Sequence, residues 1–277
     1  MVIALCQSHG DNVDLSVILF GMGIINFRTV QNALAGCAWG DTLLTYDRIG
    51  STMDKARELA NKKAPEGTLV VAAEQTSGRG RLTRHWLSPE GSLSLSVLLY
   101  PPVEDLPYLT MMAGLAVTQA IEAAVSVNTG LKWPNDVLLD NRKVAGILVE
   151  SGVVADKPFA IIGIGVNVNV DISQYHEVAA IATSLSDATG GQVDILKLLR
   201  AVIVNLEDLY LNFDGRRIYE SWCKWLITIG LEVRAFLGDQ VIDGTAIGVR
   251  DNGALIIRKK DGSEHDVVAG DVMLRHA

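Results

Sequence analysis

The chain has 277 residues and a formal net charge of −8, with 24 basic against 32 acidic side chains. This acidic balance argues against electrostatic DNA binding, which depends on clustered Lys and Arg. With 49% hydrophobic and 20% charged residues, the composition indicates one or two globular domains and excludes a disordered chain. Cys6, Cys37 and Cys223 are far apart and form no Cys-x-x-Cys pair, so neither a zinc site nor a disulfide framework is expected, and a reducing cytoplasm is the natural compartment.

An apolar run from Leu15 to Ile25 precedes the first clear periodicity. It is shorter than the about 20 residues that span a bilayer. No Lys or Arg precedes it, as would be typical of a secretory signal. We expect no membrane association, and three interpretations stay open: an added extension, a packed segment or a targeting element.

Regular secondary structure is predicted from about Asp41 onward. A strand at 43–46 leads to a helix that Ser51 or Thr52 can cap, with Asp54 in its first turn. The apolar run 68–73 predicts a buried strand. The alternation of Ser with Leu or Val in 92–99 predicts a half-buried strand.

The second half of the chain predicts a helix, a group of strands, two further helices and a small barrel. In chain order these are the helix 106–127, the strands 131–168 with a turn at 140–142, the helices around 195–209 and 218–225, and short strands after 229. We therefore predict three parts: an N-terminal extension of unclear role (1–40), a catalytic domain (41–228) and a small C-terminal domain (229–277).

A glycine-arginine loop follows the strand at 68–73. It reads Ser77-Gly78-Arg79-Gly80-Arg81, with Arg84 and Trp86 close behind. Glycine lets backbone approach a ligand, and arginine offers a planar fork of donors to carboxylate or phosphate. Local cations in an acidic chain favour a small-anion site that orders around its ligand. The alternative is a flexible surface turn with solvated arginines.

A second basic segment, Lys132-Trp133-Pro134-Asn135-Asp136, lies about fifty residues later, with Lys143 beyond the next turn. Pro134 restricts the backbone of Trp133 and makes a rigid bend. On an antiparallel hairpin, Lys143 would lie close to that bend. Asn135 and Asp136 could orient a ligand, coordinate Mg²⁺ through water or accept a proton. The alternative is a proline turn with an Asx cap.

Gly163 and Gly165 interrupt the apolar strand 162–168. They do not match a dinucleotide fingerprint, and no helix follows at once. They instead indicate a strand that a neighbour or ligand approaches closely. The chain contains no Walker A loop and no metal-binding pattern among its five histidines.

Together these segments resemble the biotin protein ligases, also called biotin–acetyl-CoA-carboxylase ligases, from about Asp41 to Arg275. The resemblance rests on the two basic segments and on Lys143–Glu150, Gly163–Asn167 and Ala182–Leu185. It implies an α+β fold, with a mixed-sheet catalytic domain like that of class II aminoacyl-tRNA synthetases. Gly253-Ala254-Leu255 and Gly270-Asp271-Val272 resemble the family's SH3-like C-terminal β-barrel.

The resemblance also implies a reaction. Biotin and MgATP give biotinyl-5′-AMP, and a lysine of a biotin carboxyl carrier protein takes the biotinyl group. The implied biotin-binding residues are Ser51, Thr52, Met53, Gln75, Arg79, Gly80, Arg81 and Lys143. Those implied for ATP or the adenylate are Arg84, Trp86, Lys132, Asn135 and Asn167, with Trp86 stacked on adenine. Lys143, Arg81 and Asp136 would be catalytic, and Mg²⁺ would arrive on the ATP phosphates, near Asn135 and Asp136.

Departures and rivals qualify this resemblance. Gly21, Gly23 and Gly36 interrupt the N-terminal residues, which show no basic two-helix pattern, so we expect no DNA-binding domain. Leu82-Thr83 and His85 stand where some members have more glycine and basic residues, which bears on adenylate affinity. A lipoate–protein ligase and a biotinyl-AMP sensor without transfer are the rival functions. An exposed sheet edge is expected to allow a homodimer.

Overall fold

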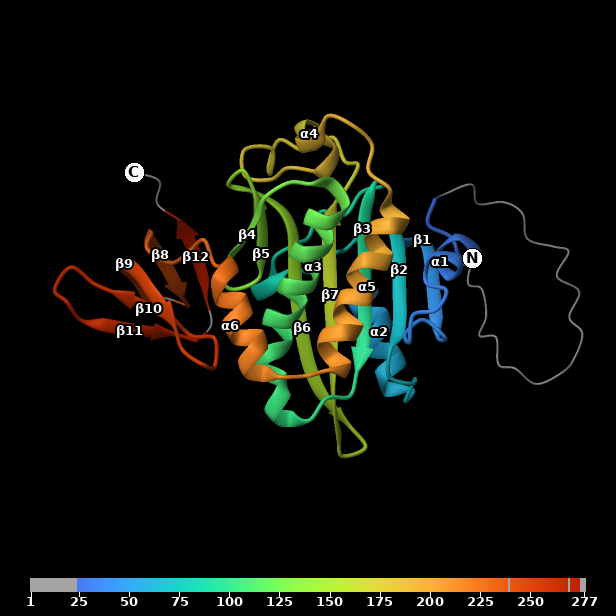
Figure 1. Cartoon of the computed structure of the whole chain (residues 1–277), viewed down its shortest axis with the longest axis horizontal. Coiled ribbons are helices and arrows are strands. Elements are labelled where there is room, and N and C mark those ends of the chain that lie inside the picture. Colours follow the sequence, from blue (N-terminus) through green and yellow to red (C-terminus); the bar gives the residue numbers. More distant parts are fainter. Residues whose placement is uncertain (1–23, 239, 269, 275–277) are drawn as a thin grey trace, which may run out of the picture.

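The computed structural model describes residues 24–238, 240–268 and 270–274. They form a seven-stranded sheet in the order β1-β2-β3-β7-β6-β5-β4 and a five-stranded sheet in the order β11-β10-β9-β8-β12 (Figure 1). In the larger sheet β1 and β2 are parallel, and the other neighbouring strands are antiparallel. The expected mixed sheet is therefore confirmed.

The elements follow the predicted order. The strands of the larger sheet are β1 (Leu43–Ile49), β2 (Thr68–Gln75), β3 (Ser92–Leu99), β4 (Thr129–Lys132), β5 (Asp136–Leu139), β6 (Arg142–Val154) and β7 (Lys157–Asn167). The helices are α1 (Phe27–Ala33), α2 (Thr52–Asn61), α3 (Leu109–Val125), α4 (Leu185–Thr189), α5 (Ile195–Leu211) and α6 (Gly215–Trp225). The turn at Asp140 and Asn141 has both residues at positive φ (49° and 61°), as a tight hairpin turn requires.

Helices cover both faces of the larger sheet. α3 packs against the sheet with α5 and α6 beside it, whereas α2 packs on β2, β3 and β7 (Figure 1). The segment Val103–Val125 is long and apolar enough to cross a bilayer, but 61% of its most apolar stretch is buried in the protein. It is therefore the central core helix of this domain.

The strand β3 differs from its prediction, because all eight of its residues are buried. Leu93, Leu95, Val97 and Leu99 join the main core beneath α3, whereas Leu98 packs in the second core with α2. Its serine side chains face the side that α2 covers, where Ser94 pairs with Ser88 and Ser96 Oγ donates to Thr52 Oγ1 at 2.9 Å. The predicted alternation of two faces is present, but the polar face contacts protein hydroxyls instead of solvent.

The smaller sheet contains β8 (Glu232–Leu237), β9 (Gln240–Val249), β10 (Leu255–Arg258), β11 (Glu264–Val267) and β12 (Asp271–Leu274). All of its pairings are antiparallel. The edge strands β11 and β12 are not paired with each other among the described residues, so the closed SH3-like barrel is not confirmed. Trp133 Nε1 links the two sheets by donating to the Gly253 carbonyl at 2.8 Å.

The described residues before β1 pack against the domain of the larger sheet. Asn26 caps α1, and Val30, Leu34 and Trp39 are buried in the main core. Trp39 N donates at 2.6 Å to Oε1 of Glu207, a residue of α5. Ile25 is also buried, whereas residues 15–23 of the apolar run lie outside the described residues. A part of the predicted extension is therefore core structure.

Cys37 and Cys223 are free thiols, and burial raises the pKa of each. Cys6 lies outside the described residues.

Candidate functional site

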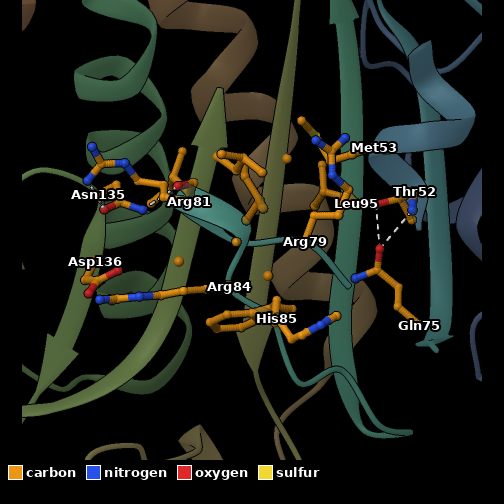
Figure 2. A pocket seen from close by; sticks show the side chains of 18 of the residues that line it. Thr52, Met53, Gln75, Arg79, Arg81, Arg84, His85, Leu95, Asn135 and Asp136 are labelled. Carbon is orange, nitrogen blue, oxygen red and sulfur yellow. Dashed lines mark hydrogen bonds between the residues drawn. The ribbon is translucent and has the colours of Figure 1, made fainter. Parts of the chain in front are cut away.

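A cavity of about 110 Å³ opens on the face of the larger sheet that α2 covers (Figure 2). It brings together the glycine-arginine loop and the Lys-Trp-Pro-Asn-Asp bend. Its lining includes these predicted residues: Thr52, Met53, Gln75, Arg79, Gly80, Arg81, Arg84, Trp86, Asn135, Asp136 and Lys143. The two segments that stood out in the sequence are therefore walls of one pocket.

One end of the pocket carries neutral hydrogen-bonding groups. Ser51 caps α2 by accepting from Asp54 N, which places Thr52 at the start of the helix. Thr52 N and Thr52 Oγ1 both donate to Gln75 Oε1, at 2.8 and 3.1 Å. The amide of Gln75 is thereby fixed, with its nitrogen on the pocket side (Figure 2). Such an end suits a ligand group with amide-like donors and acceptors.

The floor of the pocket is made of glycines on β6 and β7. A Cβ atom at Gly165 would overlap the Trp86 indole, and one at Gly163 would lie 2.5 Å from Met53 Sδ. A Cβ at Gly146 would lie 3.1 Å from both the Trp86 ring and Lys143 Cε. The predicted close approach to this strand is confirmed. Within the described residues, the buried Trp86 Nε1 has no hydrogen-bond partner.

The opposite end of the pocket is cationic. Lys143, at the start of β6, lies beside the bend as predicted: its Nζ is 2.5 Å from Asp136 Oδ1 and 5.2 Å from the centroid of the Trp86 ring. Lys132 Nζ lies 3.8 Å from Asp136 Oδ2, and Arg84 points towards Asp136 (Figure 2). One carboxylate among three cations leaves a net positive region, which attracts anions.

Arg81 joins the loop to the C-terminal sheet. Its Nη1 donates to Asn135 Oδ1 at 3.4 Å and to the Gly270 carbonyl at 3.0 Å. Asn135 Nδ2 in turn donates to the Ile147 carbonyl at 2.7 Å. In this structure both side chains of the Asn135-Asp136 pair contact protein groups, since Asp136 pairs with Lys143. The described residues contain no cluster of three or more His, Cys, Asp or Glu suited to a metal ion.

Three predicted residues do not line the pocket. Ser51 is buried as a helix cap, and Lys132 reaches the site only through its ion pair with Asp136. Asn167 is also buried, with Nδ2 donating to the Thr183 carbonyl at 3.0 Å. Further lining residues were not among the predicted site residues: His85, Leu95, Gly146, Ile147, Leu148, Gly163, Ile164 and Gly165. Most of these residues lie on the two strands that glycines interrupt, β6 and β7, and those glycines were the feature of the sequence that could have identified them.

Family models match most of the chain. Residues 45–167 match the biotin/lipoate A/B protein ligase family, and residues 228–275 match the biotin protein ligase C terminal domain. The bifunctional ligase/repressor BirA of Bacillus spizizenii is 40% identical over 231 residues, covering 80% of this chain and 71% of that protein. The biotin–acetyl-CoA-carboxylase ligase of Mycobacterium tuberculosis is 31% identical over 258 residues, covering 89% and 94% of the two chains.

Solved structures agree with these matches. The biotin protein ligase from Aquifex aeolicus in complex with biotin and ATP superposes with a TM-score of 0.71 at 33% identity, covering 86% of this chain and 100% of that one. The Leishmania major biotin protein ligase in complex with biotinyl-5-AMP gives a TM-score of 0.59 at 27% identity, covering 83% and 100% of the two chains. With the pocket, both domain matches and these relatives in agreement, the chain belongs to the biotin protein ligase family.

Proposed function

We propose that this protein activates biotin with MgATP to biotinyl-5′-AMP and transfers the biotinyl group to a lysine of a biotin carboxyl carrier protein, the biotin-bearing component of acetyl-CoA carboxylase. One observation carries the proposal: a single pocket joins a neutral, amide-binding end to a cationic end around Lys143. The ureido group of biotin suits the first end, and its carboxylate, placed against a triphosphate, suits the second.

In the first step the biotin carboxylate attacks the α-phosphorus of ATP, and pyrophosphate leaves. The two reactants repel each other, by about 4 kcal/mol for unit charges about 4 Å apart at an effective dielectric of about 20. Lys143 and Arg81 offset this repulsion, and they stabilise the transition state further because charge builds between them. Arg84 and Lys132 neutralise phosphate oxygens, and Trp86 stacks on adenine.

In the second step the carrier lysine attacks the carbonyl carbon of the mixed anhydride. The carbon–oxygen bond to AMP breaks, an amide forms, and Asp136 accepts the proton that the lysine loses. The pairing of Asp136 with Lys143 supports this role, because departure of the cation towards phosphate frees the carboxylate. The glycine-arginine loop covers the anhydride and keeps water from it.

Magnesium enters this proposal as part of the substrate. Asn135 is held by Arg81 and the Ile147 carbonyl, and Asp136 serves as the base of the second step, so neither is assigned as a metal ligand. Mg²⁺ therefore arrives on the phosphates of ATP, and no protein residue is assigned as its direct ligand.

The remaining expectations stay predictions. These are a cytoplasmic location, the lack of a DNA-binding domain, a C-terminal SH3-like barrel, and the division into 1–40, 41–228 and 229–277. The family match that begins at residue 228 supports the second boundary.

A homodimer is supported by an open edge of β6. The pairing of β6 with β5 ends at Gly146, while its pairing with β7 continues to Val154. Light scattering of the full chain measures its mass in solution and thereby distinguishes a monomer from a homodimer.

The function is tested by incubating the protein with MgATP, an apo carrier domain, and either biotin or lipoate. With biotin, we expect the carrier mass to rise by one biotinyl group, attached to one lysine. With lipoate, we expect no change in the carrier mass. Transfer of lipoate in place of biotin would make the protein a lipoate ligase. Bound biotinyl-AMP with an unmodified carrier would make it a sensor.

A further inference from the structure

Backbone hydrogen bonds fix the base of the glycine-arginine loop, including one from Gln75 N to the Ser88 carbonyl at 2.9 Å. Thr76 N and Ser77 N donate to the carbonyls of Ile49 and Gly50, each at 2.9 Å. Trp86 N donates back to the Gly78 carbonyl at 2.9 Å. Within residues 79–85, Gly80 N donates to the Arg84 carbonyl at 2.8 Å and Arg84 N to the Arg81 carbonyl at 3.1 Å. These bonds join the loop to itself, so the side chains of this stretch attach it to the rest of the domain.

The Arg79 side chain makes ionic contacts with two carboxylates outside the loop. Its Nη1 lies 2.9 Å from Asp54 Oδ1 and 3.1 Å from Glu150 Oε2, and its Nη2 pairs with Glu150 Oε1. Glu150, with 19% of its side chain exposed, also pairs with Arg57 of α2. The loop, helix α2 and strand β6 therefore meet in one ionic cluster.

The charges of this cluster cancel. Two guanidinium groups, of Arg79 and Arg57, face two carboxylates, of Asp54 and Glu150. A guanidinium in a bidentate pair with Glu150 has its fork of donors committed to protein oxygens. It contributes little net positive charge to the pocket, unlike Lys143 at the other end.

We propose that Arg79 is a positioning residue, whose guanidinium latches the loop to Glu150 and Asp54 instead of binding the substrate. Glu150 is the central acceptor of the latch, because it receives both arginines. This inference rests on the proposed function only in taking the loop as the cover of the adenylate. It replaces the predicted contact between the Arg79 side chain and biotin, and it leaves the loop backbone free to meet the ligand.

Limited digestion with trypsin tests the latch without biotin, ATP or carrier. The loop holds cleavage sites after Arg81 and Arg84, which report its opening directly. Removing a bidentate charged pair should raise the initial cleavage rate at these sites about tenfold. We expect this increase in both Glu150→Gln and Arg79→Gln, and no further increase in the double variant. Because no substrate takes part, failure of the proposed function would leave this readout intact.

A matched control is Asp243→Asn. It removes the carboxylate of another bidentate pair, with Arg234 at 2.8 and 3.0 Å, within the C-terminal sheet. Its loop cleavage should equal that of the parent protein. Thermal melting confirms that every variant is folded before digestion.

Steady-state kinetics separate the latch from a direct contact. If the latch holds, Glu150→Gln reproduces the kinetic loss of Arg79→Gln, and Arg79→Lys recovers part of it. If the Arg79 guanidinium binds substrate directly, Glu150→Gln frees it and keeps parental cleavage and turnover, while Arg79→Gln loses activity. That second pattern would overturn the proposal.

Discussion

Gly165→Ala is the most informative single change in the pocket, because it adds one methyl group where the indole of Trp86 lies. A Cβ at this position would overlap the ring, with Cζ2 at 2.8 Å. The indole is rigid, so either the strand shifts or the whole ring leaves the floor. Overpacking of this kind costs about 1–3 kcal/mol.

We expect that cost to appear in function more than in stability, since Trp86 is only partly buried and lies in the loop rather than in the hydrophobic core. The KM for ATP should rise about 5- to 150-fold, because 1.4 kcal/mol corresponds to a factor of ten. Biotin-dependent exchange of pyrophosphate into ATP measures this KM, and thermal melting measures stability.

Two other glycines serve as comparisons. Gly163→Ala meets the thioether of Met53, the far end of a flexible side chain that can move aside, so its effect on ATP should be small. Gly191→Ala meets open space and should be neutral. An unchanged KM for ATP in Gly165→Ala, with an unchanged melting temperature, would refute the packing of Trp86 against this strand.

Three further variants test other parts of the site. Lys143→Met should slow adenylate formation roughly a thousandfold without unfolding the protein, because it removes about 4 kcal/mol of charge compensation; single-turnover production of biotinyl-AMP measures this. Ser96→Ala removes the hydroxyl that orients Thr52 and should raise the KM for biotin about three- to tenfold at constant kcat. Trp133→Phe removes the hydrogen bond to Gly253 and should lower the free energy of unfolding by about 1 kcal/mol, seen in urea denaturation.

Local chemistry predicted much of this fold. The Ser51 cap, the Asp140-Asn141 turn and the strand after it are short-range features, written in neighbouring residues. The burial of β3 was missed, because its serines looked solvent-facing until α2 and Thr52 were known to cover them. Alternation identifies two faces of a strand, but only the tertiary arrangement decides what each face meets.

The same distinction applies to the site residues. Lys143 was predicted to lie close to the bend because one hairpin connects them. The register places Lys143 opposite Leu138, so its ion pair with Asp136 runs diagonally past a β-bulge that the sequence did not predict. Arg79 is different: its partners lie on α2 and β6, and Glu150 is 71 residues away in the chain. A sequence motif identifies which arginines lie near a pocket. It does not identify which of them is paired with a carboxylate from a distant part of the chain.

The two arginines of the loop, Arg79 and Arg81, therefore have different roles. They are two residues apart, yet Arg79 pairs with the carboxylates of Asp54 and Glu150. Arg81 instead contacts Asn135 and the backbone carbonyl of Gly270, which belongs to the C-terminal domain. A carboxylate holds an arginine far more strongly than an amide or carbonyl oxygen does, because only the carboxylate is charged. The carboxylates of Asp54 and Glu150 thus let Arg79 hold the loop in place, while Arg81 lines the pocket and connects the loop to the C-terminal sheet.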